Sequence, residues 1–109
     1  MKPLLPTMKE KKRYLVYELI SKEPLKGRPQ HDVISHLRKT LGVFDCARAG
    51  VQAVAWDHER QIGTLRVSHR SVDTVKAALL LLTDIKGTKV IPKTRGVSGI
   101  LKKTARFTA

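Results

Sequence analysis

Apolar positions along the chain follow alternating and helical patterns that predict a series of short elements. Residues 13–21 are rich in aromatic and branched side chains and contain no glycine or proline, which predicts a β-strand. Prolines and a glycine then break this run. Pro29 suits the first turn of a helix, and Gly42 is a natural stop for it. Between them lies an apolar stripe at helical spacing, made by Val33, Ile34, Leu37 and Leu41.

The next part of the pattern predicts a β-hairpin and a second helix. Residues 48–56 and 61–68 have strand-like composition, and the polar residues 57–60 between them form a connection of hairpin length. Ser71 can cap the helix that follows, and Gly87 is a candidate for its end. The apolar stripe of this helix is Val72, Val75, Leu79 and Leu82.

The last third of the chain predicts a fourth strand and a basic C-terminal helix. Pro92 within residues 88–93 favours an edge position for that strand, and Ser98 can cap the final helix. The order strand, helix, strand, strand, helix, strand predicts an α+β, ferredoxin-like βαββαβ sandwich. In this fold two helices cover one face of a four-stranded antiparallel sheet, and here a basic C-terminal helix is added.

Charge is concentrated at the two ends of the 109-residue chain. It contains 22 Lys and Arg against nine Asp and Glu, a net charge of +13. Residues 1–13 carry a net +4, and residues 86–109 carry +7 without a single acid. Such margins around a nearly neutral body favour a polyanionic partner. Nucleic acid is the leading class, ahead of an acidic protein or an anionic membrane.

The domain organisation is simple. We expect residues 1–10, which contain two prolines, to be an extended basic arm, and residues 11–109 to form one RNA-binding domain with a helical tail. Cys46 is the only cysteine, so no internal disulfide can form and a reducing compartment fits. The longest apolar run, residues 77–82, is far too short to span a membrane. These features predict a soluble, cytoplasmic protein.

Strand alternation also predicts which side chains face the helices. In the first strand Leu15, Tyr17 and Leu19 would point to the helices, and Glu18 would lie on the open face of the sheet. Arg66 of the third strand would share that open face. We expect Glu18 and Arg66 to be neighbours, because a lone charge among apolar residues needs a partner. The rest of this face is apolar, so the C-terminal helix, a second copy or another subunit should cover it.

The sequence offers no convergent set of catalytic groups. Asp57 and Glu59 are better explained as solvated turn residues than as metal ligands. Cys46 has no base nearby in the sequence and is interpreted as a buried structural thiol. The histidines are interpreted as surface residues because they do not gather on one face of a predicted element: His31, His36, His58 and His69. We therefore predict no catalytic residues, no metal site and no bound cofactor.

Two modes of nucleic-acid contact can be weighed from the sequence. Residues 95–99 lack the ending of a P-loop, and they either bring Arg95 and backbone amides to a phosphate or form a plain turn. Base stacking on the sheet, as in RNA-recognition motifs, is not expected because the third strand has no aromatic residue. Tyr14 and Tyr17 lie on opposite faces, and Trp56 is interpreted as a packed residue.

The second helix has an apolar surface to spare. The run Ala77–Leu82 is apolar around most of a helical circumference, so Leu80 or Leu81 must point away from the sheet. Either the tail covers these side chains or a partner protein does, and we favour a partner.

Several short segments, taken in order, have a recognisable pattern: residues 5–7, 10–14, 17–21, 65–67, 77–79 and 95–99, followed by the basic tail. No segment is specific alone, but their order and spacing together are. In this order the chain resembles the archaeal ribonuclease P protein component two family, which is shared with a eukaryotic ribonuclease P and MRP subunit. Long acidic loops of eukaryotic relatives are absent, which favours the compact archaeal type.

The resemblance implies a non-catalytic subunit of the ribonucleoprotein that removes the 5′ leader from precursor tRNA. In that enzyme the RNA is the catalyst and uses Mg²⁺. The implied partners are ribonuclease P RNA and component three, a TIM-barrel-like subunit, with precursor tRNA contacted indirectly and self-association as a further option. Leu80 and Leu81 are the candidates for protein contact. The RNA-facing candidates that the resemblance implies are Lys11, Lys12, Arg13, Arg95, Lys102 and Lys103.

Two other functions stay open at this point. One is a structural RNA-binding protein of the same fold, for example one associated with the ribosome. The other is a regulatory domain that binds a small ligand, for which a net charge of +13 has no purpose.

Overall fold

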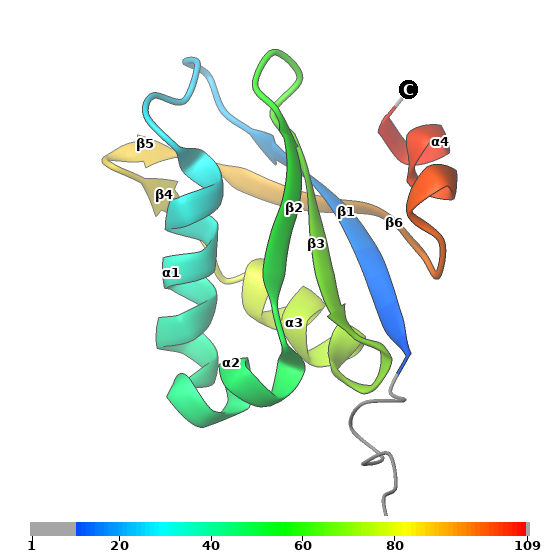
Figure 1. Cartoon of the computed structure of the whole chain (residues 1–109). Helices are drawn as coiled ribbons and strands as arrows, with labels where there is room; N and C mark the ends of the chain where they lie inside the picture. Colours follow the sequence, from blue (N-terminus) through cyan, green and yellow to red (C-terminus); the bar gives the residue numbers. More distant parts are fainter. Residues whose placement is uncertain (1–10, 109) are drawn as a thin grey trace, which may run out of the picture.

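The computed structural model describes residues 11–108, and its elements follow the predicted order with two additions (Figure 1). The four-stranded sheet has the order β2-β3-β1-β6, and each neighbouring pair is antiparallel. A separate two-stranded hairpin, β4-β5, lies between α3 and β6 in the chain. The elements are β1 (Lys12–Ile20), α1 (Pro29–Leu41), α2 (Val43–Ala49), β2 (Gln52–Asp57), β3 (Ile62–Ser68), η2 (His69–Ser71), α3 (Val72–Leu79), β4 (Asp84–Ile85), β5 (Thr88–Lys89), β6 (Ile91–Ser98), η3 (Leu101–Thr104) and α4 (Ala105–Thr108).

The hydrophobic core lies between the sheet and the helices α1 and α3. As predicted, Leu15, Tyr17 and Leu19 of β1 are buried in this core. The helices contribute buried apolar residues at the predicted helical spacing. These residues pack against the core-facing side chains that alternate along β1 and β3. The helical contributors to the cluster include Val33, Leu37, Val75, Ala78 and Leu79.

Tyr17 occupies the centre of this core. Its ring lies against Gly63 of β3, which leaves no room for a side chain there, and its centroid is 6.3 Å from that of Trp56. Trp56 is half-buried and packs on the core, as the sequence analysis expected. Burial raises the pKa of the Tyr17 hydroxyl above its ordinary value, because the charged phenolate would lose its hydration.

The first difference from the sequence prediction is the helix α2. Residues 48 and 49 were assigned to the second strand, but they form the last turn of α2, and β2 begins only at Gln52. Gly42 does end α1, and with φ +86° it redirects the chain into a second helix. The apolar side chains of Val43 and Phe44 point outward, so α2 has no apolar stripe that periodicity could detect.

The second difference lies after α3, which ends at Leu79 rather than near Gly87. Gly87 instead closes the β4-β5 turn with φ +86°, and its N–H donates to Asp84 Oδ2 at 3.3 Å. The predicted strand 88–93 is divided between β5 and β6, and β6 continues to Ser98. The edge position inferred from Pro92 is confirmed, because β6 is the last strand of the sheet. Ser71 precedes α3 without making a side-chain cap.

The C-terminal segment packs on the open face of the sheet, the face away from α1 and α3. Gly96 lies directly opposite Val16 in the register, so both are on one face, and the ring of Phe107 lies against Gly96. Figure 1 shows α4 beside β6, away from the other helices. Ser98 does not cap a helix; its hydroxyl donates to the Ile100 carbonyl and accepts from the Ile100 N–H in the turn before η3. The tail therefore covers part of this face, and the C-terminal helix was one of the three covers predicted for it.

Candidate nucleic-acid interface

Glu18 on the open face is paired with Arg95, not with Arg66. Its Oε1 accepts a hydrogen bond from Arg95 Nη1 at 2.8 Å, with both side chains about a quarter exposed. Glu18 lies opposite Ile62 on β3, whereas Arg66 lies opposite Tyr14, four residues further along. That offset is about 13 Å along the strand. The predicted Glu18–Arg66 contact is therefore wrong, although both residues are on the predicted face.

A β-bulge explains why Arg95 reaches Glu18. Tyr17 pairs with Thr94 and Val16 with Gly96, so Arg95 is an extra residue in β6. At such a bulge two consecutive residues lie on the same face, which here brings Arg95 and Gly96 together onto the open side. Arg95 Nε also donates to the Phe107 carbonyl. Arg95 was predicted to contact RNA; its observed contacts join β1, β6 and the tail.

The basic residues at the start of β1 lie beside the turn that leads into the tail. The guanidinium of Arg13 approaches Gly99, with Nη1 3.1 Å from the position that a Cβ would occupy. Lys12 reaches across the sheet so that its Nζ lies near Gly50, before β2. Lys11 is held to η2, because its carbonyl accepts the backbone N–H of His69 at 3.0 Å. The start of β1 therefore lies beside the basic tail that follows β6, at one end of the sheet. The lysines within residues 86–93 lie at the other end of β6, where Lys93 pairs with Glu18.

We call this region the basic end and define it by Lys11, Lys12, Arg13, Lys102 and Lys103. All five side chains are exposed or half-exposed. Within residues 11–108 none of the five forms an ion pair with a carboxylate, unlike Arg48, which pairs with Asp45, and Arg95, which pairs with Glu18. The basic residues 2 and 9 of the predicted arm 1–10 lie outside the described residues.

Two further cations lie near the basic end but were not predicted as RNA contacts. Arg66 is exposed opposite Tyr14, and Arg70 belongs to η2, next to the contact between His69 and Lys11. As the one charged residue of β3, Arg66 stood out in the sequence, where it was predicted as the partner of Glu18.

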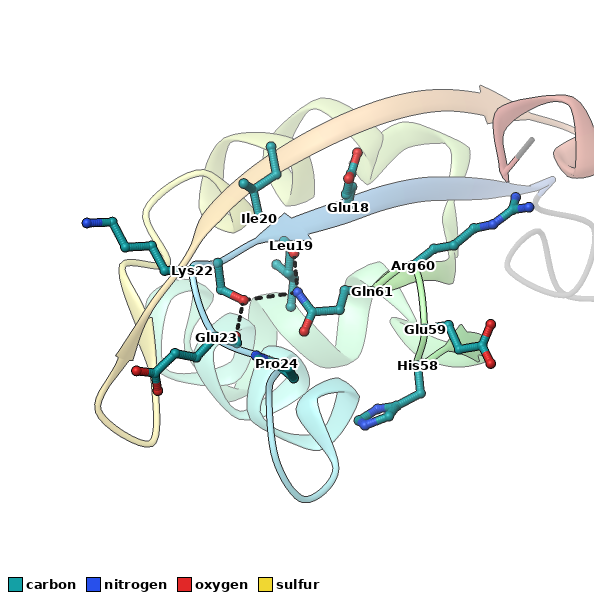
Figure 2. Close-up of a pocket in the computed structure, with 11 residues that line it drawn as sticks. Glu18, Leu19, Ile20, Lys22, Glu23, Pro24, His58, Glu59, Arg60 and Gln61 are labelled. Carbon is teal, nitrogen blue, oxygen red and sulfur yellow. Dashed lines mark hydrogen bonds between the residues drawn. The ribbon is translucent and has the colours of Figure 1, made fainter.

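An open pocket of about 310 Å³ lies at the opposite end of β1, against the β2-β3 turn (Figure 2). Its lining includes Glu18, Glu23, His58, Glu59 and Arg60. In Figure 2 the side chains of Glu23 and Glu59 point away from each other, and His58 points away from Glu18. A catalytic set needs side chains that converge on one reacting atom, and these do not converge.

The floor of this pocket is organised by Gln61, which has φ +55°. Its Oε1 accepts the backbone N–H of Leu25 at 2.8 Å. Its Nε2 donates to the Leu19 carbonyl at 2.7 Å and to the Ser21 hydroxyl at 3.1 Å. Gln61 thus fastens the loop after β1 to the β2-β3 turn, which is a structural role.

Metal binding and membrane insertion can be assessed within the described residues. No group of three or more His, Cys, Asp or Glu side chains there is arranged to hold a metal ion. None of the helices in that part of the chain is both long and apolar enough to cross a membrane.

His36 links α1 to α3, because its Nε2 lies 2.7 Å from the Ala78 carbonyl.

The predicted protein-contact residues Leu80 and Leu81 follow the last turn of α3 and are 55% and 64% exposed. Both side chains therefore point away from the core, whereas the helical pattern required this of only one of them. Phe44 and Val43 of α2 are more exposed still, at 84% and 69%, and the sequence analysis did not select them.

Comparison with known proteins identifies the family. The model of the Rpp14/Pop5 family matches residues 13–109. Ribonuclease P protein component 2 of Thermococcus gammatolerans is 37% identical over 106 residues, covering 96% of this chain and 88% of the relative. The protein of the same name from Archaeoglobus fulgidus is 36% identical over 108 residues, covering 97% and 95%.

Solved structures agree at the level of the fold. A chain in the cryo-EM structure of yeast ribonuclease MRP matches with a TM-score of 0.62, covering 90% of this chain and 78% of that one. Its sequence identity is 14%, so this match concerns the fold alone. The family match over nearly the whole sequence, together with the archaeal relatives, shows that this chain belongs to the Rpp14/Pop5 family.

Proposed function

We propose that this chain is a protein subunit of ribonuclease P, which binds and supports the catalytic RNA that removes the 5′ leader from precursor tRNA. Relatives that match nearly the whole chain carry the name ribonuclease P protein component 2. The observation that carries the proposal on this chain is the closeness of the basic start of β1 to the basic tail, which together form the basic end. Lysines and arginines without carboxylate partners are the groups that bind a phosphate backbone.

The proposed RNA contacts are Lys11, Lys12, Arg13, Arg95, Lys102 and Lys103. Arg95 is in addition proposed to position the tail, which is supported by its bonds to Glu18 and Phe107. These bonds hold the tail against β6, so that Lys102 and Lys103 stay beside β1. We also assign the chain to the ferredoxin-like class, supported by the strand order β2-β3-β1-β6 and by the helices that connect its strands.

Catalysis in this proposal belongs to the RNA, and the chain supplies no catalytic residue. The non-convergent side chains of the pocket support this assignment. Mg²⁺ is assigned to the RNA as well, because a surface as basic as this one repels a divalent cation. A cytoplasmic location is part of the same proposal.

The proposed protein partner is ribonuclease P protein component three, docked through Leu80 and Leu81. The two exposed leucines are neighbours in the chain, and contiguous exposed apolar side chains are typical of protein contacts. Self-association through the same residues is the other outcome, which measurement of the oligomeric state separates from binding to component three. Contact with precursor tRNA is expected to be indirect, through the RNA.

Reconstitution tests the proposal. The full chain and component three are added to the cognate ribonuclease P RNA at a modest Mg²⁺ concentration, and precursor-tRNA cleavage is measured. We expect faster cleavage than with the RNA alone, and a smaller gain with the Lys102→Ala/Lys103→Ala variant. No gain from the native chain would reject the proposal. RNA binding without a gain would favour a structural RNA-binding protein of another ribonucleoprotein, such as the ribosome.

A further inference from the structure

One row of side chains crosses all four strands on the open face next to the basic end. In the register Arg66 pairs with Tyr14 on one side and with Gln52 on the other, and Tyr14 pairs with Ser98. Directly opposite residues of antiparallel strands project to the same face. The row therefore runs Gln52, Arg66, Tyr14, Ser98, with the aromatic ring and the guanidinium on the two central strands.

This row is accessible, whereas the middle of the same face is closed. Tyr14 is half-exposed, and Arg66 and Gln52 are exposed. Two residues further along β1, Val16 is fully buried, and Phe107 lies against its neighbour Gly96. Phe107 of the tail thus lies over the neighbouring position of the sheet and forms a border of the row.

Charge around the row favours a polyanion. Within the described chain Arg66 takes part in no ion pair. Lys12 lies on the same face as Tyr14, two residues earlier in β1, which is about 7 Å along the strand. A phosphate bound by Lys12 would place the base of the same or the next nucleotide over the row.

We propose that Tyr14 and Arg66 form a stacking platform for one unpaired base of the bound RNA, with the Gln52 amide available to the edge of that base. The inference rests on the proposed RNA-binding function and goes beyond phosphate contact. Unpaired bases stack on aromatic rings and on arginine guanidinium planes. The absence of an aromatic residue from β3 argued against this mode of binding; Arg66 occupies the matching place on β3 and supplies a planar group instead.

Variants of the full chain test the platform by their effect on binding to the cognate ribonuclease P RNA over a series of salt concentrations. Tyr14→Leu should weaken binding about 5- to 150-fold, the range that loss of one aromatic side chain stacked on a base causes. Its slope of log affinity against log salt should match the native slope, because stacking releases no counterion. Tyr14→Phe keeps the ring and should bind like the native chain. Arg66→Lys keeps the charge but removes the planar group, and should weaken binding without changing the slope.

The controls separate this inference from the proposed function. Lys102→Ala/Lys103→Ala should lower the slope, which Tyr14→Leu should not. If the native chain binds the RNA with an affinity that falls as salt rises, and Tyr14→Leu binds equally tightly, the platform is overturned and the proposed function stays in place. Equal decreases in affinity for Tyr14→Phe and Tyr14→Leu also overturn it. Absence of RNA binding by the native chain contradicts both. If Tyr14→Leu does not fold, as circular dichroism would show, Arg66→Lys and Tyr14→Phe decide the question.

Discussion

The ring of Phe107 packs directly against Gly96, so the C-terminal helix is seated on β6 at a position that admits no side chain. Gly96→Ala should therefore push the tail off the sheet and lower the free energy of unfolding by about 1–3 kcal/mol, the usual cost of overpacking. Urea denaturation followed by circular dichroism measures this change.

The matched control for this prediction is Gly99→Ala. A Cβ at residue 99 would meet only the far end of the Arg13 side chain, at 3.1 Å from Nη1. We expect its effect on stability to be clearly smaller. Equal effects of the two substitutions would show that the contact between Phe107 and Gly96 does not hold the tail.

The ion pair between Glu18 and Arg95 predicts a measurable coupling. Both side chains are about a quarter exposed, so the pair is less screened than a surface pair but is not fully desolvated. A double-mutant cycle with Glu18→Gln and Arg95→Met should give a coupling of about 1 kcal/mol in unfolding free energy, smaller at 1 M salt. The same cycle with Arg66→Met in place of Arg95→Met should give none, and a coupling to Arg66 would contradict the observed register.

Gln61 predicts a stability effect far from the basic end. Replacing it with Gly suits the positive φ but removes the partners of the Leu25 N–H and the Leu19 carbonyl. Despite the relaxed backbone, Gln61→Gly should lower the unfolding free energy by about 1–3 kcal/mol, because part-buried polar groups lose their hydrogen bonds. A gain in stability would mean that backbone strain at residue 61 outweighs those bonds. RNA affinity should be unchanged in the folded variant.

Tyr17 predicts a fall in stability in alkali. Burial raises its pKa in the folded state above the value of about 10 in the unfolded chain. The contribution of protonated Tyr17 to the free energy of unfolding is fully present below pH 10. It is lost as the pH rises above 10, because the unfolded chain releases the Tyr17 proton at a lower pH than the folded chain does. The decrease should be about 1.4 kcal/mol per pH unit above 10. Unfolding of the native chain and of Tyr17→Phe between pH 9 and 11 measures it: the native curve should fall more steeply, and parallel curves would contradict the assignment.

The sequence predicted those parts of the fold in which burial imposes a period. The alternation of Leu15, Tyr17 and Leu19 reflects a strand with one face in the core, and Pro29 and Gly42 mark the ends of α1 by their backbone chemistry. The helix α2 was missed because Phe44 points to solvent, so no period records it. Burial patterns describe only elements that have a buried side.

The contact between Glu18 and Arg95 could not be predicted for a different reason. It depends on a bulge in β6, an edge strand whose exposed and half-exposed residues show no clean alternation. Charge clustering predicted the members of the basic end from their positions in the chain. Their meeting in space depends on the antiparallel pairing of β1 with β6, which places Arg13 beside Gly99.

The central claim, that the basic end lies against an RNA phosphate backbone, is tested most directly by the salt dependence of binding to the cognate ribonuclease P RNA. Replacing Lys102 and Lys103 with Ala should lower the slope of log affinity against log salt by up to about 1.4–1.8, because each lysine bound to a phosphate displaces counterions from the RNA. Lys22→Ala/Lys26→Ala, which removes two exposed lysines after the far end of β1, should leave the slope unchanged. A slope that is unchanged in the Lys102→Ala/Lys103→Ala variant, or that falls equally in both variants, would contradict the claim.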